Sequence, residues 1–217
     1  MFDWNDSASL DRDVIIEFLR KHATVDWGGY RVHDGSYTHL LQVPEELADL
    51  ICFLMEDGLT GGSLLEIGFA EGFTNTILHK IFKFELITAV DVEPSSVSPA
   101  FFASNCKYKP LNFFFGKSSD SRIIKSVNSL GPYDVVFIDA SHEYEDMMAD
   151  FANFFDSEKS RYAIFHDIRN DRWPGCGFAW ESIKKSFPHF SYREFIGPPR
   201  AYNCGIGVLI NDIPSDL

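Results

Sequence analysis

The stretch LLEIGFAEGFTNTIL, residues 64–78, decides the fold of this chain. It begins with a short apolar run typical of a buried strand and continues as an amphipathic helical pattern. Between the two, Gly68 permits a tight turn close to a ligand, and Gly72 allows the strand and the helix to pack closely. Such glycines also occur in bare strand–helix turns. The stretch therefore predicts a strand–turn–helix unit whose helix N-terminus offers N–H groups to a polar ligand.

The rest of the body repeats this alternation. Apolar runs of strand length recur, with helical patterns between most of them, and residues 94–106 form a weaker helical pattern. After the fifth run, Phe178, Ile183 and Phe187 mark the expected inner face of a helix. The alternation predicts a parallel sheet with right-handed crossovers, and the short loop between the last two runs predicts an antiparallel pair. The predicted strands are 63–67, 86–90, 112–115, 134–138, 162–165, 191–196 and 205–210.

The N-terminal part predicts a helical cap on this body. It contains two amphipathic helical patterns, the second of which opens at Pro44, a position that suits proline, with Glu45 and Glu46 in its first turn. The loop between them, residues 25–39, is long and rich in glycine and aromatic residues. We predict a single domain over 1–217, with the cap over 1–59 and the α/β core over 60–211.

The composition narrows the function classes. The chain has 217 residues, 45% of them hydrophobic, and a formal net charge of −13, which describes a globular protein with an acidic surface. Because such a surface repels phosphate backbones, we expect no nucleic-acid partner. No apolar run approaches the ~20 residues that span a bilayer, and no leader pattern is present, so we expect a cytoplasmic protein without membrane contact. The cysteines lack zinc-site spacing, although Cys176 and Cys204 lie in late loops where they could pair.

A second motif, ITAVDVEP at residues 87–94, follows the glycine turn. Asp91 ends the second predicted strand, and an acid at this place commonly holds a ribose diol in nucleotide-binding folds. Glu93 is the alternative ribose ligand, and Asp91 could also be a solvated carboxylate at a strand end.

The two motifs together resemble the class I S-adenosylmethionine-dependent methyltransferases, over roughly residues 60–211. The resemblance implies a Rossmann-like three-layer α/β/α sandwich with a seven-stranded, mostly parallel sheet whose last strand is antiparallel. It implies that the glycine loop holds the methionine part of S-adenosylmethionine and that Asp91 binds its ribose. Ala70 stands where the family's commoner motif has its second glycine. The implied cofactor-binding residues are Glu66, Gly68, Phe69, Gly72, Asp91, the adenine-loop residues Ser118 and Ser119, and Asp139.

Polar side chains also end the fourth and fifth predicted strands. Asp139 ends the fourth, His142 follows three residues later, and YAIFHD delivers His166 and Asp167. Open α/β sheets place their sites at these carboxyl ends, and carboxylates with open positions suit Mg²⁺, Ca²⁺ or Mn²⁺. Asp139 could instead cap the following helix, His142 could be a surface or capping residue, and His166 could point into the core.

The sequences FIDASHEYED and FHD resemble a narrower branch, the metal-dependent O-methyltransferases and the related cephalosporin-hydroxylase-like group. This resemblance implies that Asp139 and Asp167 bind a divalent metal, with Mg²⁺ the first expectation and His166 a candidate third ligand. It also implies that His142 is a general base, because relatives that act on sugars carry a histidine three residues after the first ligand. The fifth-strand pair in several relatives is two acids, or Asp followed by Asn, so the third ligand stays open.

The motifs predict a metal-assisted O-methyltransferase that acts on a small hydroxylated molecule such as a sugar moiety. A bound metal lowers the pKa of a hydroxyl group, and a histidine can take its proton, which makes Asp139 and His142 the catalytic candidates. A metal-independent small-molecule methyltransferase and a non-catalytic cofactor-binding module are the alternatives. A homo-oligomer is compatible with the sequence. Trp173, Arg200, Tyr202 and Asn203 are candidates for the acceptor pocket, or ordinary loop residues.

Overall fold

The computed structural model describes residues 11–23, 40–92, 111–198 and 204–212. Several sequence predictions lie outside these residues and are not tested by the structure. They are the loop 25–39, the weak helical pattern at 94–106, the alternative ribose ligand Glu93 and the acceptor-pocket candidates Arg200, Tyr202 and Asn203.

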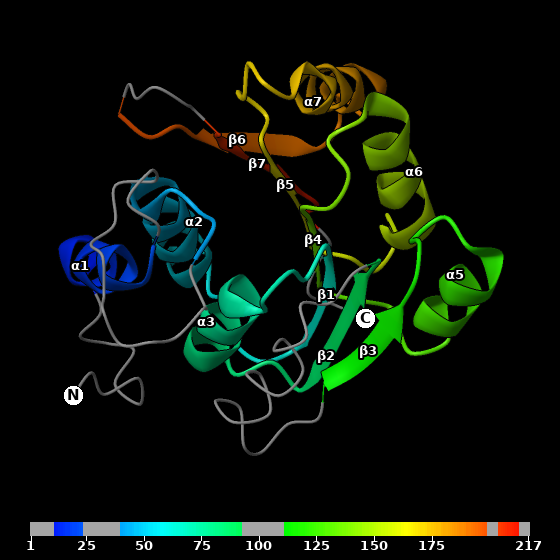
Figure 1. The fold of residues 1–217 in the computed structure, drawn as a ribbon, viewed down its shortest axis with the longest axis horizontal. Coiled ribbons are helices and arrows are strands. Elements are labelled where there is room, and N and C mark those ends of the chain that lie inside the picture. The colour runs from blue at the N-terminus through cyan, green and yellow to red at the C-terminus, as the bar shows by residue number, and fades with distance from the viewer. Residues whose placement is uncertain (1–10, 24–39, 93–110, 199–203, 213–217) are drawn as a thin grey trace.

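A seven-stranded sheet forms the centre of the molecule, in the order β3-β2-β1-β4-β5-β7-β6 (Figure 1). Neighbouring strands pair in parallel except at β7, which runs antiparallel to both β5 and β6. This confirms the predicted sheet, and each predicted strand boundary lies within one residue of the observed one. The strands are β1 (Ser63–Ile67), β2 (Leu86–Asp91), β3 (Leu111–Phe115), β4 (Val135–Ile138), β5 (Tyr162–His166), β6 (Ser191–Phe195) and β7 (Ile206–Ile210).

Helices cover both faces of the sheet, as the three layers in Figure 1 show. Successive strand residues point to opposite faces, so the adjacent Leu64 and Leu65 of β1 belong to two different apolar clusters. The cluster around Leu64 contains the buried side chains of α1, α2 and α3, and the cluster around Leu65 contains those of α5, α6 and α7. These helices are α1 (Arg12–His22), α2 (Pro44–Glu56), α3 (Phe73–Phe82), α5 (Ser121–Asn128), α6 (Tyr144–Phe154) and α7 (Pro174–Ser186).

One residue of a predicted helix face is wrong, while Ile183 of the same face is buried as predicted. Phe178 was expected on the inner face of α7, but its side chain is 66% exposed. The buried stripe of α7 instead runs through Cys176, Trp180 and Ile183, at spacings of four and three residues. Phe178 falls outside this helical period and therefore faces solvent despite its large apolar ring. Among the described residues, no helix is long and apolar enough to cross a membrane.

The order of the sheet brings the predicted motifs to one edge. β1 lies between β2 and β4, and β4 lies next to β5, with all four strands parallel. The segments that follow these strands therefore emerge on the same side. The glycine turn after β1 consequently faces Asp91 on one flank and Asp139 on the other.

Candidate active site

The glycine turn after β1 is packed against the end of β4. Gly68 has a φ of +90°, and a Cβ added to it would lie 2.1 Å from the backbone oxygen of Asp139. Gly72 has a φ of +73°, and a Cβ there would lie 2.2 Å from the Phe69 ring. Only glycine fits either position without moving these neighbours. Gly72 thus shapes the loop around Phe69 and is the N-cap residue of α3.

Asp91 holds the glycine turn in place. Its Oδ2 accepts hydrogen bonds from the backbone N–H of Phe69, at 2.8 Å, and of Ala70, at 2.7 Å. Ala70 itself adopts a left-handed φ of +45°. The sequence motif predicted a ribose ligand at Asp91 and gave no sign of these two backbone contacts. The carboxylate sets the shape of the loop that would receive the cofactor, in addition to lining the pocket.

One pocket of about 800 Å³ joins the motifs. Its walls come from the segments that follow β1 to β5 and from residues just before α2. Gly72 is absent from the described lining, because it lies behind Phe69. The other predicted site residues that line the pocket are Glu66, Gly68, Phe69, Asp91, Ser118, Ser119, Asp139, His142, His166 and Asp167.

Glu66 is a buried carboxyl group in the wall of this pocket. Only 2% of the residue is exposed, and its Oε2 has no hydrogen-bond partner. Burial raises the pKa of Glu66 well above its usual range, and the nearby carboxylates of Asp139 and Asp91 act in the same direction. A buried acid without a complete set of partners is suited to a cationic ligand group such as an ammonium.

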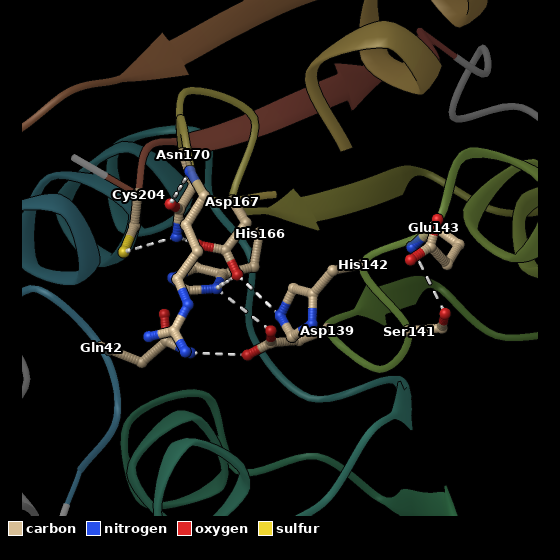
Figure 2. A network of polar contacts seen from close by, with 10 residues as sticks. Gln42, Asp139, Ser141, His142, Glu143, His166, Asp167, Asn170 and Cys204 are labelled. Atoms are coloured by element: carbon tan, nitrogen blue, oxygen red, sulfur yellow. Dashed lines mark hydrogen bonds and ion pairs between the residues drawn. The ribbon is translucent and has the colours of Figure 1, made fainter. Parts of the chain in front are cut away.

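Two histidines and two aspartates meet at the ends of β4 and β5 (Figure 2). His142 Nε2 lies 2.9 Å from Asp167 Oδ2, and His166 Nδ1 lies 3.1 Å from Asp139 Oδ1. The ring of Trp173 stacks on His142 at 4.6 Å between centroids. The structure therefore brings all four predicted residues together. They lie beside Trp173, which was predicted as a candidate for the acceptor pocket.

His166 is fully enclosed by this cluster. Its Nδ1 is also 3.3 Å from Asp167 Oδ2, but neither ring nitrogen has the geometry of a hydrogen bond. Burial lowers the pKa of His166, but the charges of Asp139 and Asp167 outweigh burial and hold it well above its usual range. The imidazole is thus the internal counter-charge of the two carboxylates.

Asp167 sits on a strained turn. Its φ is +60°, a left-handed value that is uncommon for residues other than glycine, and strain of this kind is concentrated at functional sites. Asn170 Nδ2 donates to Asp167 Oδ1 at 2.7 Å. Burial raises the pKa of Asp167, but the charge of His166, the close contacts with the two histidine rings and the hydrogen bond from Asn170 outweigh burial and lower the pKa. The carboxyl group is therefore ionised at neutral pH.

The donor atoms fit a divalent cation. Asp139, His142 and Asp167 each offer one ligand atom, all within 4.8 Å of one another. Ligand distances of about 2.1 Å around a cation such as Mg²⁺ place neighbouring donors about 3 Å apart, and within this group His142 Nε2 and Asp167 Oδ2 lie 2.9 Å apart. A second group contains His166, Asp167 and Cys204. The predicted ligand set was Asp139, His166 and Asp167, whereas the first group in the structure contains His142 in place of His166.

Sequence reasoning missed two residues that the cap contributes. Gln42 precedes α2, is 1% exposed, and donates from Nε2 to Asp139 Oδ2 at 2.7 Å (Figure 2). Glu46 on α2 is buried and accepts from the backbone N–H of Gly197 and Gly205, each at 2.9 Å. A polar glutamine inside the apolar stretch LLQVP was the only local signal for Gln42. For Glu46, the sequence predicted only a favourable position in the first turn of the helix, where its charge complements the helix dipole.

The late cysteines do not pair. Cys176 and Cys204 are both buried free thiols, and burial raises the pKa of Cys176 to about 12. Cys204 Sγ lies 3.9 Å from Asn170 Nδ2, next to the strained turn. Such protonated thiols act as small apolar groups.

In a comparison with known sequences, residues 65–168 match a family model that is described as a methyltransferase domain. A curated relative, the ribosomal RNA large subunit methyltransferase E of Treponema denticola, is 40% identical over 79 residues. That alignment spans 36% of this chain and 36% of the relative, so the chain matches about a third of the length of that protein.

Solved structures share the fold. The O-methyltransferase from Bacillus cereus, in complex with SAH, has a TM-score of 0.56 at 18% identity, covering 96% of both chains. The O-methyltransferase TomG from Streptomyces achromogenes, involved in tomaymycin synthesis and solved with SAM, has a TM-score of 0.61 at 14% identity. Here 96% of this chain and 94% of that chain are covered. The Rossmann-like methyltransferase fold predicted from the sequence is thereby confirmed.

Proposed function

We propose that this chain, which is a class I S-adenosylmethionine-dependent methyltransferase, transfers the methyl group to a hydroxyl oxygen of a small molecule such as a sugar moiety, with help from a divalent metal. The observation that carries the proposal is the meeting of Asp139, His142 and Asp167 in the wall of the pocket that the glycine turn also lines. An activated methyl donor and an acceptor hydroxyl must be held close together and in line, and this pocket offers both places.

The cofactor end of the pocket has the groups that S-adenosylmethionine requires. Glu66 offers a buried carboxyl group to its ammonium, and the turn at Gly68 allows close backbone approach. Ser118 and Ser119, after β3, line the far side, where the resemblance places the adenine. The cofactor supplies the electrophilic methyl carbon, so the protein needs no nucleophile of its own.

The acceptor end has the groups that hold a metal and move a proton. Asp139 and Asp167 would hold a divalent cation, which lowers the pKa of a bound hydroxyl. Since His142 Nε2 faces Asp167 Oδ2 at 2.9 Å, Nε2 carries a proton and Nδ1 is left to accept one from the acceptor. The stacked ring of Trp173 fixes the plane of the imidazole. Asp167 thus orients His142, as carboxylates orient catalytic histidines elsewhere.

A methyl-transfer assay with and without metal tests this proposal. We expect transfer from labelled S-adenosylmethionine to a member of a panel of small hydroxylated molecules, with Mg²⁺ present and not with a chelator. His142→Ala should lower turnover by about 10²–10⁴-fold while cofactor affinity is unchanged. The exposed His189 provides a matched control, since His189→Ala should leave turnover as in the wild type. Unchanged turnover in His142→Ala would remove the proposed base.

One observation favours a metal-independent methyltransferase as the second candidate. The buried imidazole of His166 already balances the charges of Asp139 and Asp167. In that case the same acceptor would be methylated at equal rates with Mg²⁺ and with a chelator. Both candidate functions have a small-molecule acceptor. The net charge of −13 favours such an acceptor over a nucleic acid, whose phosphates the protein would repel.

A further inference from the structure

Arg172 is a cation at the acceptor end of the pocket. Arg172 lines the pocket and is exposed, and within the part of the chain that the structure describes it makes no ion pair. Its neighbour Arg169 shows the contrast, because that guanidinium pairs with Glu194. In a chain with 32 acidic and 19 basic residues, an arginine that stays unpaired in a pocket keeps its capacity to bind an anion.

The turn that carries Arg172 is fixed by hydrogen bonds. Asn170 Nδ2 donates to Asp167, while Asn170 Oδ1 accepts from the backbone N–H of Arg172 at 3.0 Å. The backbone oxygen of Asn170 accepts from the N–H of Trp173 at 2.9 Å. The backbone of Arg172 is therefore held relative to the same Asp167 that contacts His142.

The Arg172 side chain lies against the aromatic wall of the acceptor end. Its Cζ is 5.3 Å from the centroid of the Trp173 ring, and that ring stacks on His142. Contact with an aromatic ring reduces the rotameric freedom of a guanidinium and leaves its N–H fork available for hydrogen bonds. The guanidinium thus stands one aromatic residue away from the histidine at which the acceptor hydroxyl would lose its proton.

The charges along the pocket place this cation at the acceptor end. Among the pocket-lining residues that the structure describes, the only Lys or Arg side chains are Lys117 and Arg172. Lys117 follows β3 on the cofactor side, and Arg172 follows β5 on the acceptor side. Apart from the buried imidazole of His166, which contacts Asp139 and Asp167, the remaining charged side chains of the described lining are acidic. Arg172 is therefore the exposed cation that an anionic group meets at the acceptor end. The acidic lining residues are Glu66, Glu71, Asp91, Asp139, Asp146 and Asp167.

We propose that Arg172 determines acceptor specificity by binding an anionic group, a carboxylate or a phosphate, that the acceptor carries next to the hydroxyl to be methylated. This inference rests on the proposed function for the identity of the acceptor end. Guanidinium binds both anions through paired N–H···O hydrogen bonds. An acceptor held at the anion by Arg172 and at the hydroxyl by His142 is fixed at two points, which aligns its oxygen with the methyl group.

Binding to the SAH-loaded protein tests this inference without requiring catalysis. Three probes share a hydroxylated ring and differ in charge: D-glucose, D-glucuronate and D-glucose 6-phosphate. Calorimetric titrations at fixed ionic strength should show at least one anionic probe binding about tenfold or more tightly than glucose. Arg172→Gln should abolish that preference while SAH still binds. The two anionic probes separate a carboxylate site from a phosphate site.

A matched variant controls for the charge change. Lys185 is an exposed cation on α7 outside the described pocket lining, so Lys185→Gln should keep the anion preference of the wild type. Equal or undetectable binding of all three probes by the wild type overturns the inference, as does a preference that survives in Arg172→Gln. Binding of a ribosomal RNA hairpin that Arg172→Gln weakens would overturn the small-molecule assignment.

The two proposals fail in different ways. A preference for anions that depends on Arg172, in a protein without methyl transfer to any hydroxylated molecule, would leave the anion site standing and overturn the proposed function. Metal-dependent methyl transfer that proceeds equally on neutral and anionic acceptors would leave the proposed function standing and overturn the role of Arg172.

Discussion

At the scale of single residues, the environment of each carboxyl group decides its chemistry. Asp91 accepts two backbone hydrogen bonds and shapes the glycine turn, whereas Glu66 on the neighbouring strand is buried with an unpartnered oxygen. Asp167 is surrounded by donors and stays ionised. Identical functional groups on one sheet edge therefore have different roles, and each role can be tested by one substitution.

Glu66→Gln should separate stability from cofactor binding. Because burial raises the pKa of Glu66 well above its usual range, replacing this carboxyl group by the neutral amide of glutamine should cost the apo protein no stability. We expect a melting temperature equal to or above that of the wild type. The Kd for S-adenosylmethionine should rise about tenfold or more, because a charge-assisted hydrogen bond to the ammonium is lost. A titration showing wild-type affinity would remove Glu66 from the cofactor site.

The buried carboxyl group of Asp150 should make the stability of the protein depend on pH. The carboxyl group is buried on α6, burial raises its pKa to about 6, and a hydrogen bond from Ser118 opposes that shift only partly. The folded state therefore binds this proton more tightly than the unfolded state. The bound proton contributes at most about 3 kcal/mol to the free energy of unfolding. This contribution is complete below about pH 4 and is lost as the pH rises through about 6.

Asp150→Asn removes this loss, because asparagine does not ionise. The variant should melt several degrees above the wild type at pH 7.5, since about 1 kcal/mol corresponds to roughly 2–4 °C for a chain of this size, and the gap should close near pH 4. Thermal melts across pH measure the difference. The exposed Asp171 supplies the control, and Asp171→Asn should follow the wild-type curve. A gap that does not change with pH would contradict the assignment.

At the scale of elements, α2 connects the cap to the far end of the sheet. Figure 1 shows α2 beside the sheet on the same side as α3. The Glu46 carboxylate accepts from Gly197 N, just after β6, and from Gly205 N, just before β7, so it ties both ends of the β6–β7 connection to the cap. Gly205 adjoins Cys204, which contacts Asn170 beside Asp167. The helix thereby supports the acceptor end of the pocket.

Glu46→Ala should destabilise the protein by about 2 kcal/mol or more, because two backbone N–H groups lose their acceptor in a buried place. Glu46→Gln should fall between the alanine variant and the wild type, since it retains one acceptor oxygen. Denaturant unfolding measures the order. Glu56 at the exposed end of α2 is the control, and Glu56→Ala should cost a few tenths of a kcal/mol at most. Equal stabilities of the two alanine variants would show that Glu46 does not tie the connection.

At the scale of the whole molecule, the pocket is assembled from five strand ends and the segment before α2. No single element contains it, so a ligand that fills it binds the folded chain and not the unfolded one. Binding of this kind raises the free energy of unfolding in proportion to the logarithm of the ligand concentration.

SAH should therefore raise the melting temperature in a concentration-dependent way. At about 100 times its Kd we expect about 2.7 kcal/mol of added stability, or roughly 5–10 °C for a chain of this size. Thermal melts at several concentrations measure the effect. Adenosine, which lacks the ammonium group that Glu66 would bind, should give a smaller shift. A melting temperature that does not respond to SAH would contradict the cofactor site.

The sequence by itself determined the order and bounds of the elements, because strand and helix periodicities are local properties of the chain. It also determined which residues end the strands, and hence that Asp139, His142, His166 and Asp167 meet at one edge. Contacts between distant residues were decided only by the tertiary structure. Gln42 and Asp139 are 97 positions apart, and Glu46 reaches Gly205 across 159. No local pattern encodes such pairs, since they depend on where packing places the cap against the sheet.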